Sequence, residues 1–210
     1  LGLATDGKVY GWGSNGFGQL GDGTTESRLE PVWSSGVNVV ARSVSAGWVH
    51  SVVLGADGKA YSWGGNAAGQ LGDGTVEERT VAVAAVGVSG NLKSVVAGGE
   101  YSLGLGEDGV VYGWGSNESG QLGDGTKVNR RSAVAGVRGE IRNGLVVGSV
   151  SAGGQHALIL ANGEPALEPP TVTAGSLSGN YGSAVSGQIE ATGRSIVEYA
   201  AVGLPEGLVL

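Results

Sequence analysis

The sequence predicts an all-β protein built from repeated antiparallel units, and three observations support this. Glycine supplies 43 of the 210 residues, yet 40% of the chain is apolar, which is typical of a folded, tight-turned protein and not of collagen or disorder. A glycine-rich segment returns three times in fixed register. Asp-Gly pairs separate short apolar runs, a strong signal for two-residue hairpin turns.

The repeated segment reads GWGSNGFGQLGDGT, SWGGNAAGQLGDGT and GWGSNESGQLGDGT, at residues 11–24, 62–75 and 113–126. Its period is therefore 51 residues. A strand that ends in aromatic-X-Trp-Gly overlaps the start of each copy, and a Val-rich strand follows it. Because a propeller blade needs four short strands, the chain predicts about three four-stranded antiparallel blades, an open arc of a β-propeller. We expect Trp12, Trp63 and Trp114 to pack between neighbouring units.

The first copy also fits the dinucleotide-binding spacing G-x-G-x-x-G, at residues 11–16. That pattern holds a pyrophosphate only where its glycines open a helix, and the glycines that follow here disfavour one. The later copies replace pattern glycines with Ser62, Ala67 and Glu118. We therefore expect no cofactor at these loops.

The unit resembles the regulator of chromosome condensation repeat over residues 1–163. The run Trp-Gly-Ser/Gly-Asn-x-x-Gly-Gln-Leu-Gly-Asp-Gly-Thr carries the resemblance, together with the later SAGWVHS, VAGGEYS and SAGGQHA segments. It implies a propeller, commonly of seven four-stranded blades, and we expect the remaining blades upstream. The best-known activity in the family is guanine-nucleotide exchange on a small GTPase, and a secreted inhibitor of β-lactamase shows that the fold can bind an enzyme.

The C-terminal part of the chain differs from the repeats in composition and pattern. Residues 164–170 read as a Pro-rich linker, and residues 171–210 alternate Thr, Ser and Val like strands. The ending YAAVGLPEGLVL resembles part of an immunoglobulin-like module common in bacterial surface and secreted proteins, so we expect an incomplete module at 171–210. This resemblance favours a bacterial extracellular or cell-surface location.

Signals for catalysis or metal binding are weak in this sequence. His50 and His156 occupy a repeat position that Tyr101 also fills, so hydrogen bonding inside each blade explains them better than catalysis does. Each Gly-Asp-Gly-Thr loop offers one carboxylate where calcium needs several, although that Asp can bond nearby backbone amides. We therefore expect no enzymatic activity, no catalytic residue, no cofactor and no metal. The net charge of −7 disfavours nucleic acid, and no apolar run is long enough for membrane insertion.

Positions that vary between copies are the best candidates for binding, because the scaffold does not dictate them. The candidates lie beside the repeated strand and after Gly-Asp-Gly-Thr: Trp48, Glu77, Glu78, Lys127, Arg130 and Arg131. Arg138 and Arg142 add to the positive charge of the third unit. We expect a protein partner with an acidic surface, and we expect Trp48 to be the apolar anchor that contacts it. The alternative is that the solvated loop residues vary without a binding role and that Trp48 packs in the core.

The sequence thus favours a non-enzymatic protein-binding scaffold propeller within a larger bacterial secreted or cell-surface protein. The alternatives are a guanine-nucleotide exchange factor for a small GTPase and a secreted enzyme-inhibitor propeller. Because an open arc exposes sheet faces and strand edges, we expect the isolated chain to be marginally stable or to self-associate.

Overall fold

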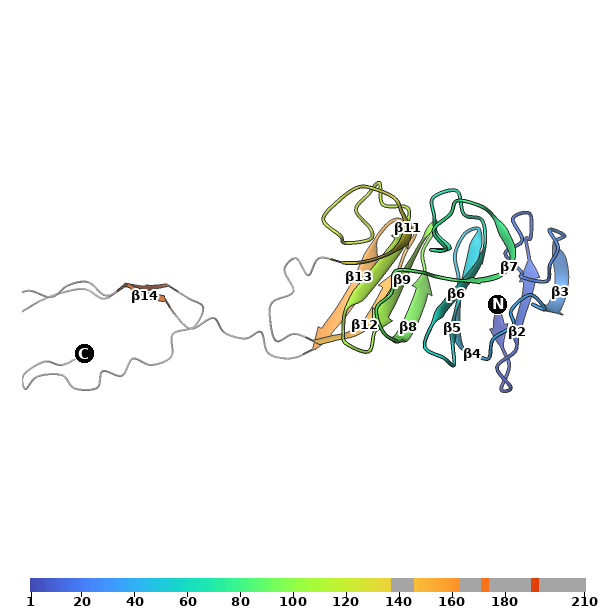
Figure 1. The fold of residues 1–210 in the computed structure, drawn as a ribbon, viewed down its shortest axis with the longest axis horizontal. Helices are drawn as coiled ribbons and strands as arrows, with labels where there is room; N and C mark the ends of the chain where they lie inside the picture. The colour runs from blue at the N-terminus through green and yellow to red at the C-terminus, as the bar shows by residue number, and fades with distance from the viewer. Residues whose placement is uncertain (137–145, 163–170, 174–189, 193–210) are drawn as a thin grey trace, which may run out of the picture. The chain divides into compact units, whose positions relative to one another are not determined.

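A computed structural model describes residues 1–136, 146–162, 171–173 and 190–192 (Figure 1). The chain divides into two units, Leu1–Gly163 and Glu164–Leu210. Every regular element within the described ranges is a β-strand. None of the described residues forms a helix that is long and apolar enough to cross a membrane.

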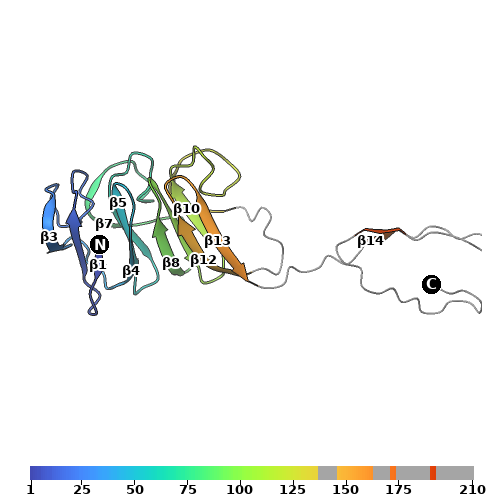
Figure 2. The same ribbon diagram turned by 180° about the vertical axis from the view of Figure 1, so that it is seen from behind.

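The first unit is a row of antiparallel sheets that follow one another in chain order, as Figures 1 and 2 show from opposite sides. The first sheet has three strands: β1 (Gly2–Leu3), β2 (Val9–Gly13) and β3 (Arg28–Trp33). The second has four: β4 (Ala41–Ala46), β5 (His50–Gly55), β6 (Ala60–Gly64) and β7 (Arg79–Ala84). The third also has four: β8 (Leu92–Ala97), β9 (Tyr101–Gly106), β10 (Val111–Gly115) and β11 (Arg130–Ala135). The last pairs β12 (Val146–Ala152) with β13 (Ala157–Asn162).

This arrangement confirms the all-β class and the four-stranded antiparallel blade. Two sheets are complete, and the sheets on either side of them have three and two strands. The same register recurs in both complete sheets, where Ser51 faces Trp63 and Ser102 faces Trp114.

Turns form at the Asp-Gly pairs, and their glycines have positive φ angles of 82°, 78° and 80° at residues 7, 58 and 109. The expected two-residue turn is wrong, because Gly58 donates to the Gly55 carbonyl and Gly55 to the Lys59 carbonyl, which makes a three-residue loop with the glycine in the left-handed position. The other two turns have the same bonds.

The indoles of Trp63 and Trp114 are fully buried between consecutive sheets. Trp63 packs on the loop of the first sheet, where a Cβ added to Gly21 would lie 2.7 Å from its Nε1 atom. Its Nε1–H donates to the carbonyl of Gln19 at 2.9 Å. The expected packing between units is thus confirmed for Trp63 and Trp114. It is wrong for Trp12, which is 48% exposed, because no loop of a preceding sheet covers it within the described residues.

In the second unit, β14 (Thr171–Thr173) and β15 (Glu190–Thr192) form an antiparallel pair. The expected linker at 164–170, most of the expected immunoglobulin-like module, and Arg138 and Arg142 lie outside the described residues. These expectations stay predictions.

Candidate protein interface

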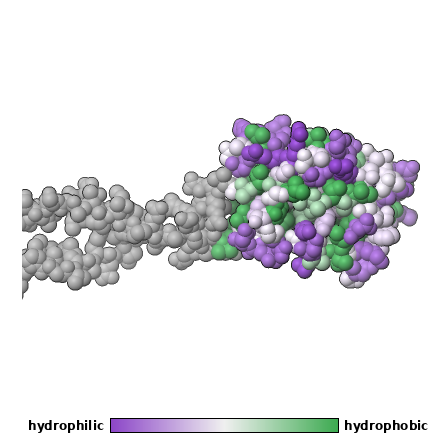
Figure 3. All heavy atoms as spheres, in the orientation of Figure 1, coloured by the Kyte–Doolittle hydropathy of each residue, from purple (hydrophilic) through white to green (hydrophobic). Residues whose placement is uncertain are grey.

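The long loops after β2, β6 and β10 lie at the same end of the sheets as the short turns before β5, β9 and β13. Antiparallel pairing causes this, because His50 at the start of β5 faces Gly64 at the end of β6. The amide of Gly65 then donates to the carbonyl of Val49 at 2.7 Å. We call this end, formed by residues 14–27, 65–78 and 116–129 with turns 47–49, 98–100 and 153–155, the loop face. It is the upper end of the sheets in Figure 1, and Figure 3 shows hydrophilic side chains gathered along it.

Each long loop is held by a buried asparagine. In the second loop the Nδ2 amide of Asn66 donates to the carbonyls of Thr75 and Glu77 and to the carboxylate of Asp73, at 2.9–3.3 Å. Its Oδ1 accepts from the amide of Leu71 at 3.0 Å. Asn15 and Asn117 make the equivalent bonds in their loops. The loop face is therefore a set of rigid loops with the same internal framework.

The loop carboxylates complete this framework. Asp124 accepts from the amide and hydroxyl of Thr126 at 2.9 and 2.7 Å, and Arg130 bonds its other oxygen at 2.6 Å. Burial of Asp124 on its own raises its pKa, but the bonds from Thr126 and Arg130 outweigh this and lower the pKa to about 2. The pKa values of Asp22 and Asp73 are lowered in the same way. These contacts confirm the expected backbone bonds of the loop Asp and leave each carboxylate fully engaged.

The lowered pKa values predict a loss of stability in acid. Because the folded pKa of Asp124 lies below its ordinary value of 3.8, its contribution is complete above that pH and is lost as pH falls towards 2. Between pH 4 and pH 2 we expect the free energy of unfolding to drop by about 1–2 kcal/mol more for the wild type than for Asp124→Asn. Urea titrations at several pH values measure this. Equal pH slopes for the two proteins would contradict it.

Arg130 was a candidate for partner contact because it is charged and lies in a stretch that varies between copies. The structure makes it part of the loop framework, since its guanidinium is held by Asp124. Arg28 and Arg79 bond Asp22 and Asp73 identically in the other loops. The sequence held the signal that was missed: these arginines recur at the 51-residue period, which marks them as scaffold. We therefore remove Arg130 from the proposed contact.

Lys127 and Arg131, by contrast, line one groove of about 460 Å³ between the second and third loops. Both side chains are exposed. Sequence reasoning missed the rest of the lining, which comes from both loops: Ala67, Ala68, Val76, Glu118, Val128 and Asn129. Glu77 and Glu78 are exposed on the second loop but do not line this groove. The groove thus combines two cations and one carboxylate with apolar side chains.

Trp48 also lies on the loop face, at the turn before β5, and is 65% exposed. Its indole packs against glycines of the next two turns. The packing is close, since a Cβ added to Gly99 or Gly154 would lie only 3.0 Å from the ring. The Trp48 amide donates to the Gly99 carbonyl, and the Gly99 amide to the Gly154 carbonyl, each at 3.1 Å. The alternative that Trp48 packs in the core is wrong. Trp48 is not among the described residues that line the groove.

The histidine position serves packing between sheets. The Nε2 atom of His50 lies 2.9 Å from Ser102 Oγ of the next sheet, and the Tyr101 hydroxyl donates to the carbonyl of His156. The expectation of a bond inside one blade is therefore wrong for His50, because the ring points across to the neighbouring sheet. Burial lowers the pKa of His50 to about 4, so the ring is neutral at neutral pH. Both His50 and Ser102 are buried, so this His–Ser pair is closed to a substrate.

Metal ligands are not grouped in the part of the chain that the structure describes: no three His, Asp or Glu side chains lie close enough together to hold an ion. The buried carboxylates Asp22, Asp73 and Asp124 stand one to a loop, each paired with arginine. Trp48, Lys127 and Arg131 are the exposed apolar and cationic side chains that were predicted for this face.

Successive antiparallel sheets with the same loop framework define a repeat-built β-propeller. Comparison with known families agrees: the model of the regulator of chromosome condensation (RCC1) repeat matches residues 6–54, 57–105 and 108–160. The chain belongs to the RCC1 repeat family.

Individual relatives are similar over the same region. The chain is 35% identical to the ultraviolet-B receptor UVR8 of Arabidopsis thaliana, over 63% of this chain and 30% of that protein. It is 32% identical to the human regulator of chromosome condensation, over 75% of this chain and 38% of that protein. The crystal structure of Prp20p from Saccharomyces cerevisiae superposes with a TM-score of 0.68 at 25% identity, over 78% of this chain and 42% of that one. The chain thus spans less than half the length of these relatives.

Proposed function

We propose that this chain is a non-enzymatic scaffold that binds another protein through its loop face. The observation that carries the proposal is the contrast between a constant framework and variable exposed side chains. Asn, Asp, Thr and Arg recur in all three loops, whereas Lys127 and Arg131 have no counterpart in the first two. Binding residues accumulate where a rigid scaffold presents loops.

The chemistry of the loop face favours a partner with an acidic surface. Lys127 and Arg131 are not bound by the carboxylate that holds Arg130. Because the chain as a whole is acidic, their positive electrostatic potential is confined to this part of the surface and can orient an acidic partner. Trp48 offers an apolar contact on the same face, and Trp and Arg are enriched among residues that dominate interfaces. The same acidity argues against nucleic acid as the partner. A relative supports protein binding in general, since Prp20p is described by its binding to Gsp1p and histones.

The cellular setting that we propose is a bacterial secreted or cell-surface protein. It rests on the resemblance of YAAVGLPEGLVL to an immunoglobulin-like module of such proteins. A secreted propeller that inhibits an enzyme is one form of the same function. Sequencing the gene upstream of Leu1 tests the setting, and a nuclear-localisation cluster there would contradict it.

Charge reversal tests the contact. In Lys127→Glu/Arg131→Glu we expect capture of the partner to weaken roughly 2- to 30-fold and to lose most of its salt dependence. The matched control is Arg42→Glu/Lys59→Glu, which makes the same charge change on exposed residues at the opposite end of the sheets. The wild type and the two double variants are each immobilised. The proteins that each of them captures from source-organism extract are then quantified by mass spectrometry. Equal losses in both variants, or none in the first, would defeat the electrostatic contact.

Guanine-nucleotide exchange on a small GTPase remains the second candidate, because the human regulator of chromosome condensation is among the relatives. An exchange assay separates the two functions. Accelerated release of bound nucleotide from a captured GTPase would favour the second candidate, and capture without acceleration would favour the scaffold.

A further inference from the structure

The groove between the second and third long loops has two walls of different chemistry. The second loop lines it with the apolar side chains of Ala67, Ala68 and Val76. The charged lining residues come from the third loop and the start of β11, and they are Glu118, Lys127 and Arg131. One wall is therefore apolar, and the other carries the charge of the described lining residues.

Backbone contacts fix the two walls of the groove relative to each other. The amide of Gly74 in the second loop donates to the carbonyl of Arg131 at 2.9 Å. The backbone of Gly69 packs on β11 so closely that an added Cβ would lie 2.8 Å from the Cα atom of Arg131. On the other wall, Oδ1 of Asn129 accepts from the amide of the buried Asn117 at 2.8 Å. The groove is thus preformed, and a ligand would not have to order these loops in order to bind.

The two cations of the groove are available to a ligand. None of the ion pairs among the described residues involves Lys127, Arg131 or Glu118. Two positive charges thus stand against one negative charge in the described lining. The framework does not require these cations, because valine and threonine occupy the equivalent positions 76 and 80 of the second repeat.

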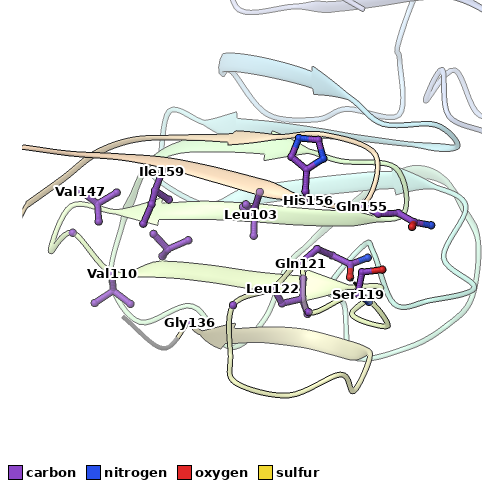
Figure 4. Close-up of a pocket in the computed structure, with 15 residues that line it drawn as sticks. Leu103, Val110, Ser119, Gln121, Leu122, Gly136, Val147, Gln155, His156 and Ile159 are labelled. Carbon is purple, nitrogen blue, oxygen red and sulfur yellow. Dashed lines mark hydrogen bonds between the residues drawn. The ribbon is translucent and has the colours of Figure 1, made fainter. Parts of the chain in front are cut away.

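A second hollow beside the third loop has a different character. This pocket of about 370 Å³ opens between the loop and β13 (Figure 4). Figure 4 shows Leu103, Val110 and Ile159 along it and the side chains of Gln121 and Gln155 at one end. No Lys, Arg, Asp or Glu is among the lining residues that the structure describes. A carboxylate therefore has lysine and arginine partners in the groove and none in the described lining of this pocket.

An extended peptide segment matches two walls of this kind. Its successive side chains point to opposite sides, so one side can be apolar while the other is acidic. Lysine and arginine pair with carboxylates, and the planar guanidinium can donate two parallel hydrogen bonds to one carboxylate. We propose that the groove binds an extended segment of the partner in which acidic residues alternate with apolar ones, an inference that rests on the proposed scaffold function. The acidic side chains face Lys127 and Arg131, and the apolar ones face Val76 and the alanines of the second loop.

Glu118 limits how acidic the segment can be. It stands on the same wall as the two cations, so it repels a carboxylate placed beside it. We expect Glu118→Gln to strengthen binding of an acidic peptide about 1.5- to 5-fold. The matched control is Glu107→Gln, which makes the same charge change on an exposed residue between β9 and β10, at the opposite end of the sheets. A gain in the control as large as in Glu118→Gln would contradict a role for Glu118 in the groove.

The other repeats supply substitutions that test each wall and keep the fold. Lys127→Val/Arg131→Thr removes both cations and introduces the residues that the second repeat has at the equivalent positions. Val76→Thr replaces a methyl group of the apolar wall with a hydroxyl, and threonine occupies the equivalent position 25 of the first repeat. Circular dichroism and urea midpoints establish that each variant is folded.

The experiment is fluorescence anisotropy of two labelled peptides titrated with the full 210-residue chain. One peptide is Glu-Val-Glu-Val-Glu-Val and the other Glu-Glu-Glu-Val-Val-Val, both with blocked termini, so that they have the same composition and charge. We expect the wild type to bind the alternating peptide at least about fivefold more tightly than the other. Lys127→Val/Arg131→Thr should weaken binding of the alternating peptide roughly 3- to 30-fold, and Val76→Thr roughly 2- to 5-fold. Equal affinities for the two peptides, no binding of either, or an unchanged affinity in the cation variant would overturn the proposal.

These outcomes can be told apart from those of the capture experiment. Charge-dependent capture of a protein, together with equal binding of the two peptides, would leave the scaffold function standing and overturn the alternating segment. Selective binding of the alternating peptide without charge-dependent capture would support the specificity of the groove and count against the scaffold function.

Discussion

Replacing Trp114 with alanine is expected to lower the free energy of unfolding by about 3–5 kcal/mol. The indole is fully buried between the second and third sheets, in a cluster with Val52, Leu92 and Val95. Its removal leaves a cavity that two rigid sheets cannot close, so both the transfer and the cavity contributions are lost. Urea unfolding followed by circular dichroism measures the change.

Trp12→Ala is the control, because it makes the same chemical change at the same repeat position. Since Trp12 is half exposed, we expect a loss of about 1 kcal/mol or less in dilute solution, where association does not contribute. Equal losses for Trp12 and Trp114 would show that burial between sheets is not the source of the stability.

The second large effect is expected from alanine at Gly72. Its φ of 71° is left-handed, and the new Cβ would lie 2.8 Å from the Trp114 ring. Left-handed strain and overpacking add, so we expect a loss of roughly 2–5 kcal/mol. Urea unfolding again provides the measurement.

Gly123→Ala separates the two causes. Its backbone is nearly the same, but the added Cβ meets open space, so strain alone should cost about 1–2 kcal/mol. The difference between the variants then measures the contact with the indole. No difference would mean that the Gly72 loop and Trp114 separate without cost, which contradicts the packing described above.

The repeat made the fold predictable, because it fixes element order, the places of the turns and the tryptophan position at once. A 51-residue period with Asp-Gly turns leaves few architectures for strands that are each about six residues long. The environment of each copy could not be predicted in the same way. Trp12 and Trp63 occupy the same position of the repeat, but Trp63 packs on the loop of the sheet before it and is buried, whereas Trp12 is half exposed.

The candidate site was predictable in part. Lys127 and Arg131 do meet in a groove, because consecutive loops lie side by side at one end of the sheets. The prediction of Arg130 treated its whole stretch as variable between copies, although arginine recurs at 28, 79 and 130, which indicates a role in the scaffold. The contributions of Val76 and Glu118 to the groove depend on how two loops approach each other, which the pattern within one repeat does not encode.

The turn that carries Trp48 imposes a rule on how this surface can vary. Its indole lies over the same position of the next two repeats, and a side chain at Gly99 or Gly154 would need the space that the ring occupies. Within these three adjacent repeats, therefore, the ring at 48 leaves little room for a side chain at 99 or 154. A larger side chain at 99 or 154 would require the ring at 48 to move or to become smaller, so these three turn positions of the chain are coupled although they lie in different repeats.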